Sequence, residues 1–328
     1  MKLNQLRYIV EVNRQGLNVS AAAEALYTSQ PGVSKQIRLL EEELGVPIFE
    51  RSGKHFVGLT AAGRNIIEVA ERILAESRNI TAIAEEHGDD RRGSLTIATT
   101  HTQARHALPT AVQRFRECFP DVSLHFHQGT PVQIAELATA GKVDFAIATE
   151  ALDLYQDLVM LPCYRWNRSI IVPEGHPLCD AAPLTLEAIA EYPLVTYVFG
   201  FTGRSQLDEA FNARGLKPDV VFTATDSEVI KTYVQLGLGV GIMASMAFEP
   251  ERDRGLVALD ASHLFTASTT RIGFRRNTYL RRFMYAFIST FAPHLTETVV
   301  NQAIQARSSE ERAALMQSLE PLLPDEGC

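Results

Sequence analysis

Apolar residues recur at helical spacing through the N-terminal part of the chain. From Leu3 to Val12 they return every three or four residues, which predicts an amphipathic helix. Ala22 and Leu26 form a second set, four apart, that stops at a polar break at Thr28 and Ser29. A third set follows the break, at Val33, Ile37 and Leu40. The pattern predicts three helices, the last two joined by a tight turn.

The third predicted helix begins sharply and carries a polar face. Ser29 can accept hydrogen bonds from the free amides of the first turn, and Pro31 is tolerated there because no intrahelical donor is lost. The face opposite the apolar positions carries short donors and cations: Ser29, Gln30, Pro31, Ser34, Lys35 and Arg38. Such a face can enter the major groove of DNA, so we interpret this helix as a DNA-recognition helix. A helical hairpin in an unrelated core is the alternative.

Residues 49–59 alternate in polarity around a central Ser-Gly, which is typical of a β-hairpin. Arg51 and Lys54 would lie on this hairpin, placed for phosphate contact rather than for base reading. Residues 1–60 are therefore predicted to form an all-α winged helix-turn-helix DNA-binding domain.

Isoleucines recur every seven residues after the hairpin, at Ile66, Ile73 and Ile80, behind a capping Thr60. This heptad pattern predicts a linker helix over residues 61–88 with a seam for a second copy. A helix of about 26 residues spans roughly 39 Å, enough to hold two winged domains on successive major-groove turns. The alternative is an amphipathic helix packed on its own domain. Residues 89–93 are predicted to be a polar hinge.

From Ser94 onward, short apolar runs alternate with helical stretches, which predicts an α/β architecture. Strands are predicted at 95–98, 122–126, 145–148, 169–172, 194–198, 220–223 and 240–243. Helices are predicted at 104–118, 132–140, 204–214 and 227–236. Parallel sheets in two lobes are the economical arrangement, with residues 94–161 and 269–296 in lobe I and 162–268 in lobe II. Residues 297–328 are predicted to be a C-terminal tail that includes one capped helix.

The net charge of −8 counts against nucleic acid as a partner unless the cations are concentrated. Residues 1–60 contain seven Lys or Arg and six Asp or Glu, so this segment is +1 and the remainder −9. A nearly neutral domain binds DNA weakly unless it is doubled. Two copies of Lys35, Arg38, Arg51 and Lys54 would give a log-log salt slope of roughly −7 if all eight contacted phosphate.

Other compositional features favour a cytoplasmic protein without a metal. No apolar run is long enough for a signal peptide or a membrane helix. The four cysteines, Cys118, Cys163, Cys179 and Cys328, lack the spacing of a zinc site or a disulfide framework. His125 and His127 share a face of a predicted strand, but no third ligand stands at a suitable spacing. A metal site is therefore not expected.

Two features suggest an enzyme only weakly. Gly237-Leu-Gly-Val-Gly241 resembles half of a dinucleotide fingerprint, but it follows a helix and precedes a strand, the reverse of the required order. His101 lies among threonines, yet no nucleophile elbow or paired carboxylate accompanies it. We expect no catalytic activity and no cofactor.

Hydroxyl groups gather at predicted strand ends, where open α/β sheets bind ligands. Thr100, Thr102 and Gln103 follow one strand, Thr149 follows a second, and Thr202 follows a third in lobe II. Helix N-termini offer free N–H groups and partial positive charge, so such side chains can hold a small anion without a full countercharge. The predicted ligand is small, oxygen-rich and anionic. A routine helix cap is the alternative for each threonine alone.

The N-terminal motifs resemble those of LysR-type transcriptional regulators. The matching residues are Ala22-Ala23, Ser29-Gln30-Pro31, Ser34, Ile37, Leu40-Glu41, Leu44-Gly45 and Phe49-Glu50-Arg51. The resemblance implies a dimerising linker helix and a two-lobed, periplasmic-binding-protein-like effector domain with a ligand cleft. A small-anion binding protein for transport is the alternative of another class, but it would need an export signal. An enzyme would not need the winged module.

Further motifs resemble the branch of this family that controls sulfur assimilation and cysteine biosynthesis. They are Thr99–Arg105, Ala148–Ala151, Leu161–Asn167, Tyr197–Ser205, Phe222–Asp226 and Ile230–Tyr233. The resemblance runs to about residue 296 and implies an acetylserine inducer, sulfate in the same cleft and a homotetramer built as a dimer of dimers. The implied effector-binding residues are Thr100, Thr102, Gln103, Thr149 and Thr202. A related branch for sulfonates and other alternative sulfur sources shares the first motif, but Phe-Gly-Phe before Thr202 favours the cysteine branch.

Overall fold

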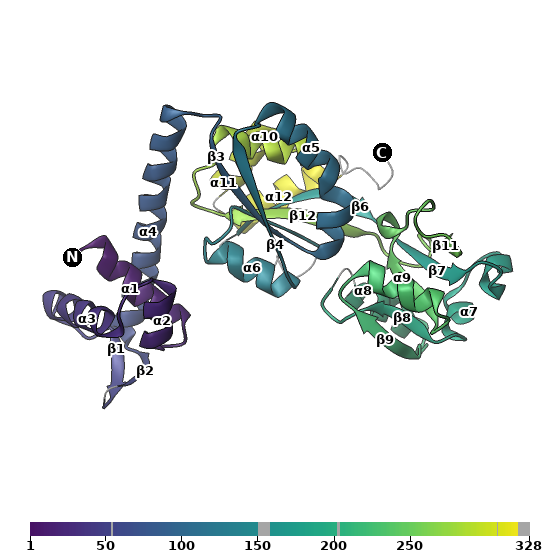
Figure 1. The fold of residues 1–328 in the computed structure, drawn as a ribbon, viewed down its shortest axis with the longest axis horizontal. Coiled ribbons are helices and arrows are strands. Elements are labelled where there is room, and N and C mark those ends of the chain that lie inside the picture. The colour runs from purple at the N-terminus through teal and green to yellow at the C-terminus, as the bar shows by residue number, and fades with distance from the viewer. Residues whose placement is uncertain (54, 150–157, 202–203, 307, 321–328) are drawn as a thin grey trace. The chain divides into compact units, whose positions relative to one another are not determined.

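The computed structural model describes residues 1–53, 55–149, 158–201, 204–306 and 308–320 (Figure 1). The chain divides into two compact units. The first comprises Met1–Ala84 with Asn277–Tyr279, and the second comprises Glu85–Arg276 with Leu280–Cys328.

The N-terminal unit is a winged helix-turn-helix, as the sequence predicts. Its elements are α1 (Leu3–Arg14), α2 (Val19–Ala25), α3 (Gln30–Leu44), β1 (Phe49–Ser52), β2 (His55–Leu59) and the long α4 (Ala61–Gly88). Asn18 caps α2 by accepting from the amides of Ser20 and Ala21. Ser29 caps α3 by accepting from the amide of Gly32. Helix α3 ends at Gly45, whose φ of 72° is a left-handed conformation that glycine adopts without strain.

One apolar core holds this unit together. The predicted inward positions of α3, Val33, Ile37 and Leu40, expose none of their surface. They pack with Leu6 and Ile9 of α1 and with residues of α2, the wing and α4. The hairpin β1–β2 is antiparallel, with Phe49 paired to Leu59. The buried stripe of α3 therefore fixes which face of that helix remains outside.

Helix α4 carries two apolar stripes. Ile67, Ala70 and Leu74 pack into the core of the winged unit, and the heptad pattern singled out neither Ile67 nor Leu74. Of the predicted seam, Ile80 is exposed, as are its apolar neighbours Val69 and Ile83 on the same helix, while Ile66 and Ile73 lie partly buried at the edge of the core. The helix therefore packs on its own domain and also presents an open apolar stripe.

Lobe I is built on a five-stranded sheet in the order β4-β3-β5-β12-β6. The strands are β3 (Gly93–Thr99), β4 (Val122–Gln128), β5 (Phe145–Ala148), β6 (Leu158–Trp166) and β12 (Ser268–Arg275). One face packs against α5 (Leu108–Cys118), α10 (Arg282–Phe291), α11 (Glu297–Gln305) and α12 (Ser309–Leu319). The other face packs against α6 (Pro131–Thr139).

Lobe II is a second five-stranded sheet in the order β11-β7-β10-β8-β9. The strands are β7 (Arg168–Pro173), β8 (Leu194–Tyr197), β9 (Val220–Ala224), β10 (Val240–Ala244) and β11 (Leu256–Asp260). Helices α7 (Leu186–Ala190) and α8 (Arg204–Ala213) cover one face, and α9 (Ser227–Gln235) covers the other. Short 3₁₀ turns lie at Pro177–Asp180 and Ser245–Ala247.

The prediction of parallel sheets is wrong, because both sheets are mixed. Strands β3, β4 and β5 are parallel, but β12 runs antiparallel to both β5 and β6. In lobe II, β8 is parallel to β9 and β10, whereas β7 is antiparallel to β10 and β11. The antiparallel partner is the returning strand β12 in lobe I and the entering strand β7 in lobe II.

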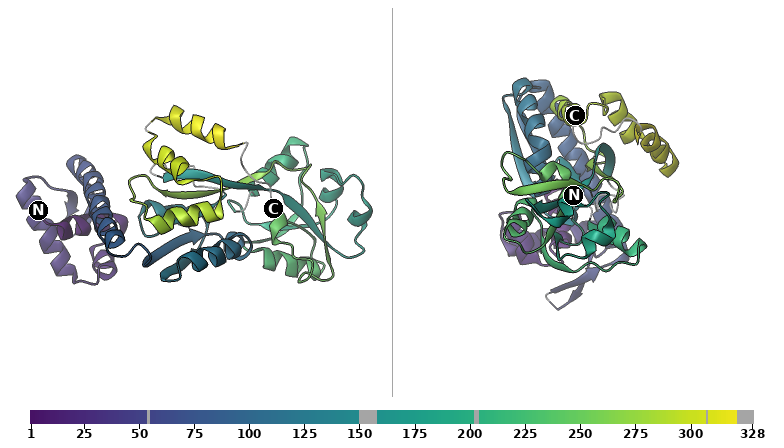
Figure 2. Two further views of the ribbon diagram at one scale, coloured as in Figure 1. Left: turned by 90° about the horizontal axis from the view of Figure 1, so that it is seen from above. Right: turned by 90° about the vertical axis from the view of Figure 1, so that its right-hand side faces the viewer.

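The predicted lobe boundary near residues 161–162 also needs correction. Strand β6 pairs with β12 as far as Trp166 opposite Ser268, so the chain leaves lobe I at Asn167. The segment after residue 296 belongs to lobe I through Leu319, because Val300, Ala303 and Leu319 are buried in its core. Figure 2 shows the yellow helices of this segment beside the sheet of lobe I. The predicted capped helix is confirmed at α12, where Ser308 and Glu311 form a capping box.

Candidate functional site

The outer face of α3 carries the predicted DNA-reading residues. Gln30, Pro31, Lys35 and Arg38 are exposed and Ser34 is half-buried. The Gln30 side-chain amide donates to the Ser34 hydroxyl at 3.1 Å. Arg38 pairs with Glu42 one turn further along at 3.1 Å. The face is therefore polar and open, but one of its cations is partly neutralised by a neighbouring carboxylate.

Glu41 connects the recognition helix to the wing. One of its oxygens accepts from the backbone amides of Ile48 and Phe49 at 2.8 and 3.2 Å. The other pairs with Arg51 at 2.5 Å, and the Arg51 guanidinium also lies 4.9 Å from the centre of the Phe56 ring. Arg51 is therefore held against the domain, with 44% of its side chain exposed. Lys54, the other predicted wing cation, lies outside the described residues.

The predicted effector residues of lobe I meet at one edge of its sheet. Strands β3 and β5 run parallel and adjacent, so Thr100 and Thr102 after β3 come near Thr149 after β5. Thr100 and Thr102 are 6% and 1% exposed. A π-helical turn, Gln103–Ala107, follows directly and begins with the buried Gln103. Such turns are frequent at functional sites.

Two of these residues, Gln103 and Thr149, are linked through Thr270 of β12. The Gln103 amide donates to the Thr270 hydroxyl at 3.1 Å, and the Thr149 hydroxyl lies 3.5 Å from that hydroxyl. We call Thr100, Thr102, Gln103, Thr149 and Thr270 the threonine cluster. No sequence pattern pointed to Thr270, because it arrives on the returning strand β12.

Two aromatic side chains of β6 complete the cluster. The Tyr164 hydroxyl donates to the side-chain oxygen of Gln103. The Trp166 indole N–H donates to the Thr149 hydroxyl at 3.3 Å. Trp166 is 2% exposed, and the Arg168 guanidinium lies over its ring, 5.2 Å from the ring centre. Both aromatic residues belong to the motif Leu161–Asn167, but their hydrogen bonds to the cluster could not be derived from it.

Lobe II brings two buried hydroxyl groups toward the cluster. The hydroxyls of Tyr197 and Ser227 are buried, and within the described part of the chain neither meets a partner at good hydrogen-bond geometry, although Thr102 and Ala244 lie near the Tyr197 hydroxyl. Burial raises the pKa of Tyr197 to about 12, and the nearby hydroxyls of Thr102 and Ser227 oppose this only in part. A buried polar group without a partner is costly, so such groups mark places where a polar ligand would be stabilised. Thr202 lies outside the described residues.

Arg204 does not supply a free charge to this region. Its guanidinium pairs with Asp208 at 2.9 Å and donates to the carbonyl of Tyr197 at 2.9 Å. Its side chain is 11% exposed. The cation is therefore used to fix the start of α8 against the end of β8.

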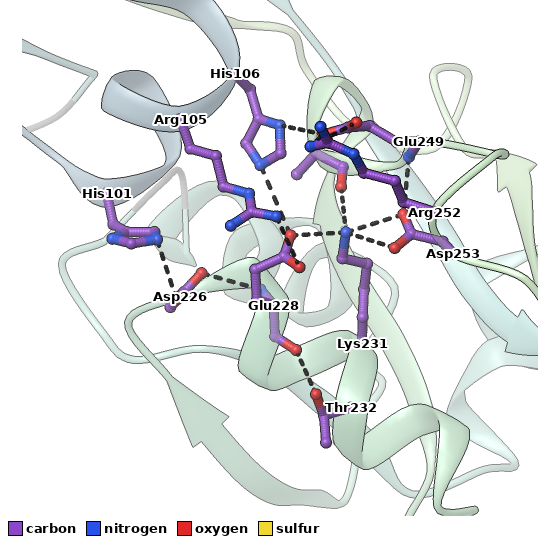
Figure 3. A network of polar contacts seen from close by, with 11 residues as sticks. His101, Arg105, His106, Asp226, Glu228, Lys231, Thr232, Glu249, Arg252 and Asp253 are labelled. Atoms are coloured by element: carbon purple, nitrogen blue, oxygen red, sulfur yellow. Dashed lines mark hydrogen bonds and ion pairs between the residues drawn. The ribbon is translucent and has the colours of Figure 1, made fainter.

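Pairs of ionisable side chains cross between the lobes (Figure 3). His101 faces Asp226 at 3.2 Å, and Arg105 faces Glu228 at 3.2 Å. His106 lies 3.5 Å from Glu249. The first member of each pair lies on the segment that carries Thr100 to Gln103. Movement of that segment would therefore change how the lobes contact each other.

His106 is the most buried member of these pairs, with 3% of its side chain exposed. Burial lowers its pKa below the ordinary value of 6.5, and the positive charges of Lys231 and Arg105 act in the same direction. The carboxylates Glu249 and Glu228 oppose the shift. Lys231 is itself buried and pairs at 2.8 Å with both Glu228 and Asp253. His106 is therefore uncharged at neutral pH in the folded chain.

No grouping of three or more His, Cys, Asp or Glu side chains within the described residues could hold a metal ion. Across the same part of the chain, no helix is both long and apolar enough to cross a membrane.

A winged helix-turn-helix joined to a two-lobed α/β unit defines a transcription regulator that responds to a small molecule. The chain belongs to the LysR family, because residues 3–64 match the bacterial regulatory helix-turn-helix protein of the lysR family and residues 88–296 match the LysR substrate binding domain. It is similar to the HTH-type transcriptional regulator CysB of Haemophilus influenzae, with 55% identity over 98% of this chain and 99% of that protein.

Two further relatives agree with this assignment. The HTH-type transcriptional regulator SsuR of Burkholderia cenocepacia is 52% identical over 92% of this chain and 97% of that protein. The crystal structure of the cofactor-binding domain of the Cbl transcriptional regulator has a TM-score of 0.64 and 45% identity, covering 66% of this chain and 95% of that one.

Proposed function

We propose that this protein regulates genes of sulfur assimilation and cysteine biosynthesis by coupling a small oxyanion effector to DNA binding. Its near full-length similarity to CysB supports this branch of the family. The Cbl-type alternative, a regulator of genes for sulfonates and other alternative sulfur sources, is supported by the similarity to the cofactor-binding domain of Cbl. We favour the cysteine branch, with the protein acting as an activator in the cytoplasm.

The main support for the proposed effector site is that uncharged hydrogen-bond donors lie together at one edge of the lobe I sheet. Gln103 and Thr149 both contact Thr270, and Thr102 lies near the buried hydroxyl of Tyr197 on the other lobe. Such a site suits an acetylserine or sulfate, because hydroxyl and amide donors bind oxyanions without a buried countercharge. Thr100 and Thr202 are the remaining effector residues of the proposal.

DNA binding is assigned to the outer face of α3 and to the wing. Ser29, Gln30, Pro31, Ser34, Lys35 and Arg38 would face the major groove, and Arg51 and Lys54 would contact phosphates. Two copies are needed, because one N-terminal segment carries a net charge of only +1. The open stripe of Val69, Ile80 and Ile83 on α4 is the proposed dimer seam, and two dimers would assemble into the tetramer.

Effector and operator are coupled through lobe closure. Ligand in the cleft would change the contacts between the lobes, the packing of dimers and so the spacing of recognition helices. Coupling of about 1 to 3 kcal/mol, a change of roughly 5- to 150-fold in DNA affinity, is sufficient.

Two variants test this division of labour. Thr100→Leu should abolish effector binding in calorimetry while leaving DNA affinity in fluorescence anisotropy unchanged. Arg38→Ala should do the reverse, because Arg38 lies on the outer face of α3. If either variant loses both activities while its melting temperature stays that of the parent, the separation of the two sites is wrong.

A further inference from the structure

An open pocket also lies between the lobes, next to the threonine cluster. It has a volume of about 310 Å³ and is lined from both lobes, among others by His101, Gln128, Gln133, Phe201 and Asp226. Pockets that hold small molecules begin at about this size. The space therefore suits a group of a few atoms rather than a large metabolite.

The charge of this pocket is opposite to that expected of an anion site. Among the described residues that line it, Asp226 is the one carboxylate and faces His101, and none is lysine or arginine. Carboxamides and threonine hydroxyls make up most of the remaining polar lining. Such a surface favours a cation over an anion.

One oxygen of Asp226 can bind a ligand without loss to the fold. Its Oδ1 caps α9 by accepting from the amide of Glu228 at 2.9 Å. Its Oδ2 faces His101 Nε2 at 3.2 Å, and the other ring nitrogen of His101 lies 3.2 Å from the side-chain oxygen of Gln128. A ligand amine can therefore replace the imidazole at Oδ2 while the cap remains.

The pocket adjoins the proposed oxyanion site. His101 stands between Thr100 and Thr102 in the chain, and consecutive Cα atoms are about 3.8 Å apart. On the opposite lobe, Asp226 precedes Ser227, whose buried hydroxyl lies near that of Tyr197. A molecule with an oxyanion and an amine separated by a few bonds can reach both places.

We propose that this pocket is a cation-accepting subsite and that Asp226 selects effectors with a primary ammonium group beside their oxyanion. The proposal rests on the proposed function, since it leaves the oxyanion to the threonine cluster. The ligand class is a small zwitterion, such as an O-acylated amino acid or an aminosulfonate. Inorganic oxyanions and N-acylated amino acids use the threonine cluster alone.

O-acetylserine and N-acetylserine are a matched pair of probes, because they are isomers and only the first has a free ammonium group. Calorimetry on the full chain at neutral pH, with freshly dissolved ligand, compares both isomers and sulfate. Asp226→Asn removes the charge but keeps a good helix cap. We expect it to lower the affinity for O-acetylserine by about tenfold or more, because a charge-assisted hydrogen bond usually contributes that much. The affinities for N-acetylserine and sulfate should fall by less than about twofold.

Two further variants make the result unambiguous. Asp226→Ser is also uncharged and cap-competent, and it should reproduce the selective loss even if the asparagine variant folds poorly. His101→Gln removes the competitor for Asp226, so it should leave the affinity for O-acetylserine unchanged or raise it.

The proposal is overturned if the uncharged variants bind O-acetylserine as the parent does, or if all three ligands weaken equally. If the parent binds none of the three ligands, the threonine cluster is not an effector site, and the proposed function fails first.

Discussion

The ion pair between Arg105 and Glu228 should contribute to effector affinity, because it joins the lobes. Its charged atoms lie 3.2 Å apart, which corresponds to about 1.3 kcal/mol in water and about 5 kcal/mol at an effective dielectric constant of 20. The side chains are 39% and 33% exposed, so solvent screening reduces this to about 0.5 to 1 kcal/mol. If the effector binds the closed lobes, removing the pair should weaken binding by roughly two- to fivefold.

A double-mutant cycle isolates this contribution. Glu228 also pairs with Lys231 at 2.8 Å, so Glu228→Gln alone removes more than one interaction. Calorimetry on the parent, Arg105→Gln, Glu228→Gln and the double variant gives the coupling between the two side chains. Arg214→Gln is the matched control, because it breaks a pair with Glu187 inside lobe II and should leave effector affinity unchanged. Additive effects of Arg105→Gln and Glu228→Gln would refute the inter-lobe role.

Four further outcomes follow from individual contacts. Because the pKa of His106 is lowered in the folded chain, the unfolded chain binds a proton more readily. The free energy of unfolding is therefore retained above pH 6.5 and falls as the pH drops below that value. His106→Gln should show a smaller acid-induced decrease in melting temperature than the parent. Gly63→Ala would place a Cβ 2.0 Å from the carbonyl oxygen of Ile48, so the melting temperature of the winged unit should fall by the equivalent of about 3 kcal/mol while effector binding persists in calorimetry. Phe287→Ala empties a fully buried site stacked on Phe145 and should cost about 3 to 5 kcal/mol in denaturant unfolding. Glu42→Gln releases Arg38 and removes a charge that repels phosphate, so anisotropy should show about twofold tighter DNA binding, and unchanged affinity would mean that Arg38 does not approach the duplex.

The N-terminal fold could be predicted because its determinants are local. The spacing of Val33, Ile37 and Leu40 gives the buried face of α3, and Ser29 and Gly45 mark its ends. For α4 the same reasoning was incomplete. The heptad of isoleucines predicted a different buried stripe from the one that contains Ile67 and Leu74. The contacts of these two residues with the winged core depend on how the helix is rotated against α1.

Strand β6 shows why lobe boundaries were misplaced. Pro162 suggests a break, since proline lacks the N–H that a strand needs. In the structure β6 lies at the edge of its sheet, and Pro162 pairs with Arg271 where the register of β12 shifts. An edge position and a bulge both tolerate proline, but neither is visible in the sequence.

The composition of the candidate site could be anticipated better than its connections. Thr100, Thr102, Gln103 and Thr149 follow strand ends, a local feature of the sequence. Their connections depend on contacts between segments more than 100 residues apart. Examples are the common partner Thr270 and the pairs that join residues 101–106 to residues 226–249. Local pattern cannot specify such contacts.

The most direct test of the central claim is a DNA retardation titration on a sulfur-assimilation promoter, at one stated salt concentration, with and without acetylserine. We expect the parent protein to shift the promoter fragment and acetylserine to change its affinity or the mobility of the complex, whereas Thr100→Leu shifts the fragment without responding. A parent protein that binds no duplex, or that binds it identically with and without acetylserine and sulfate, would contradict the account.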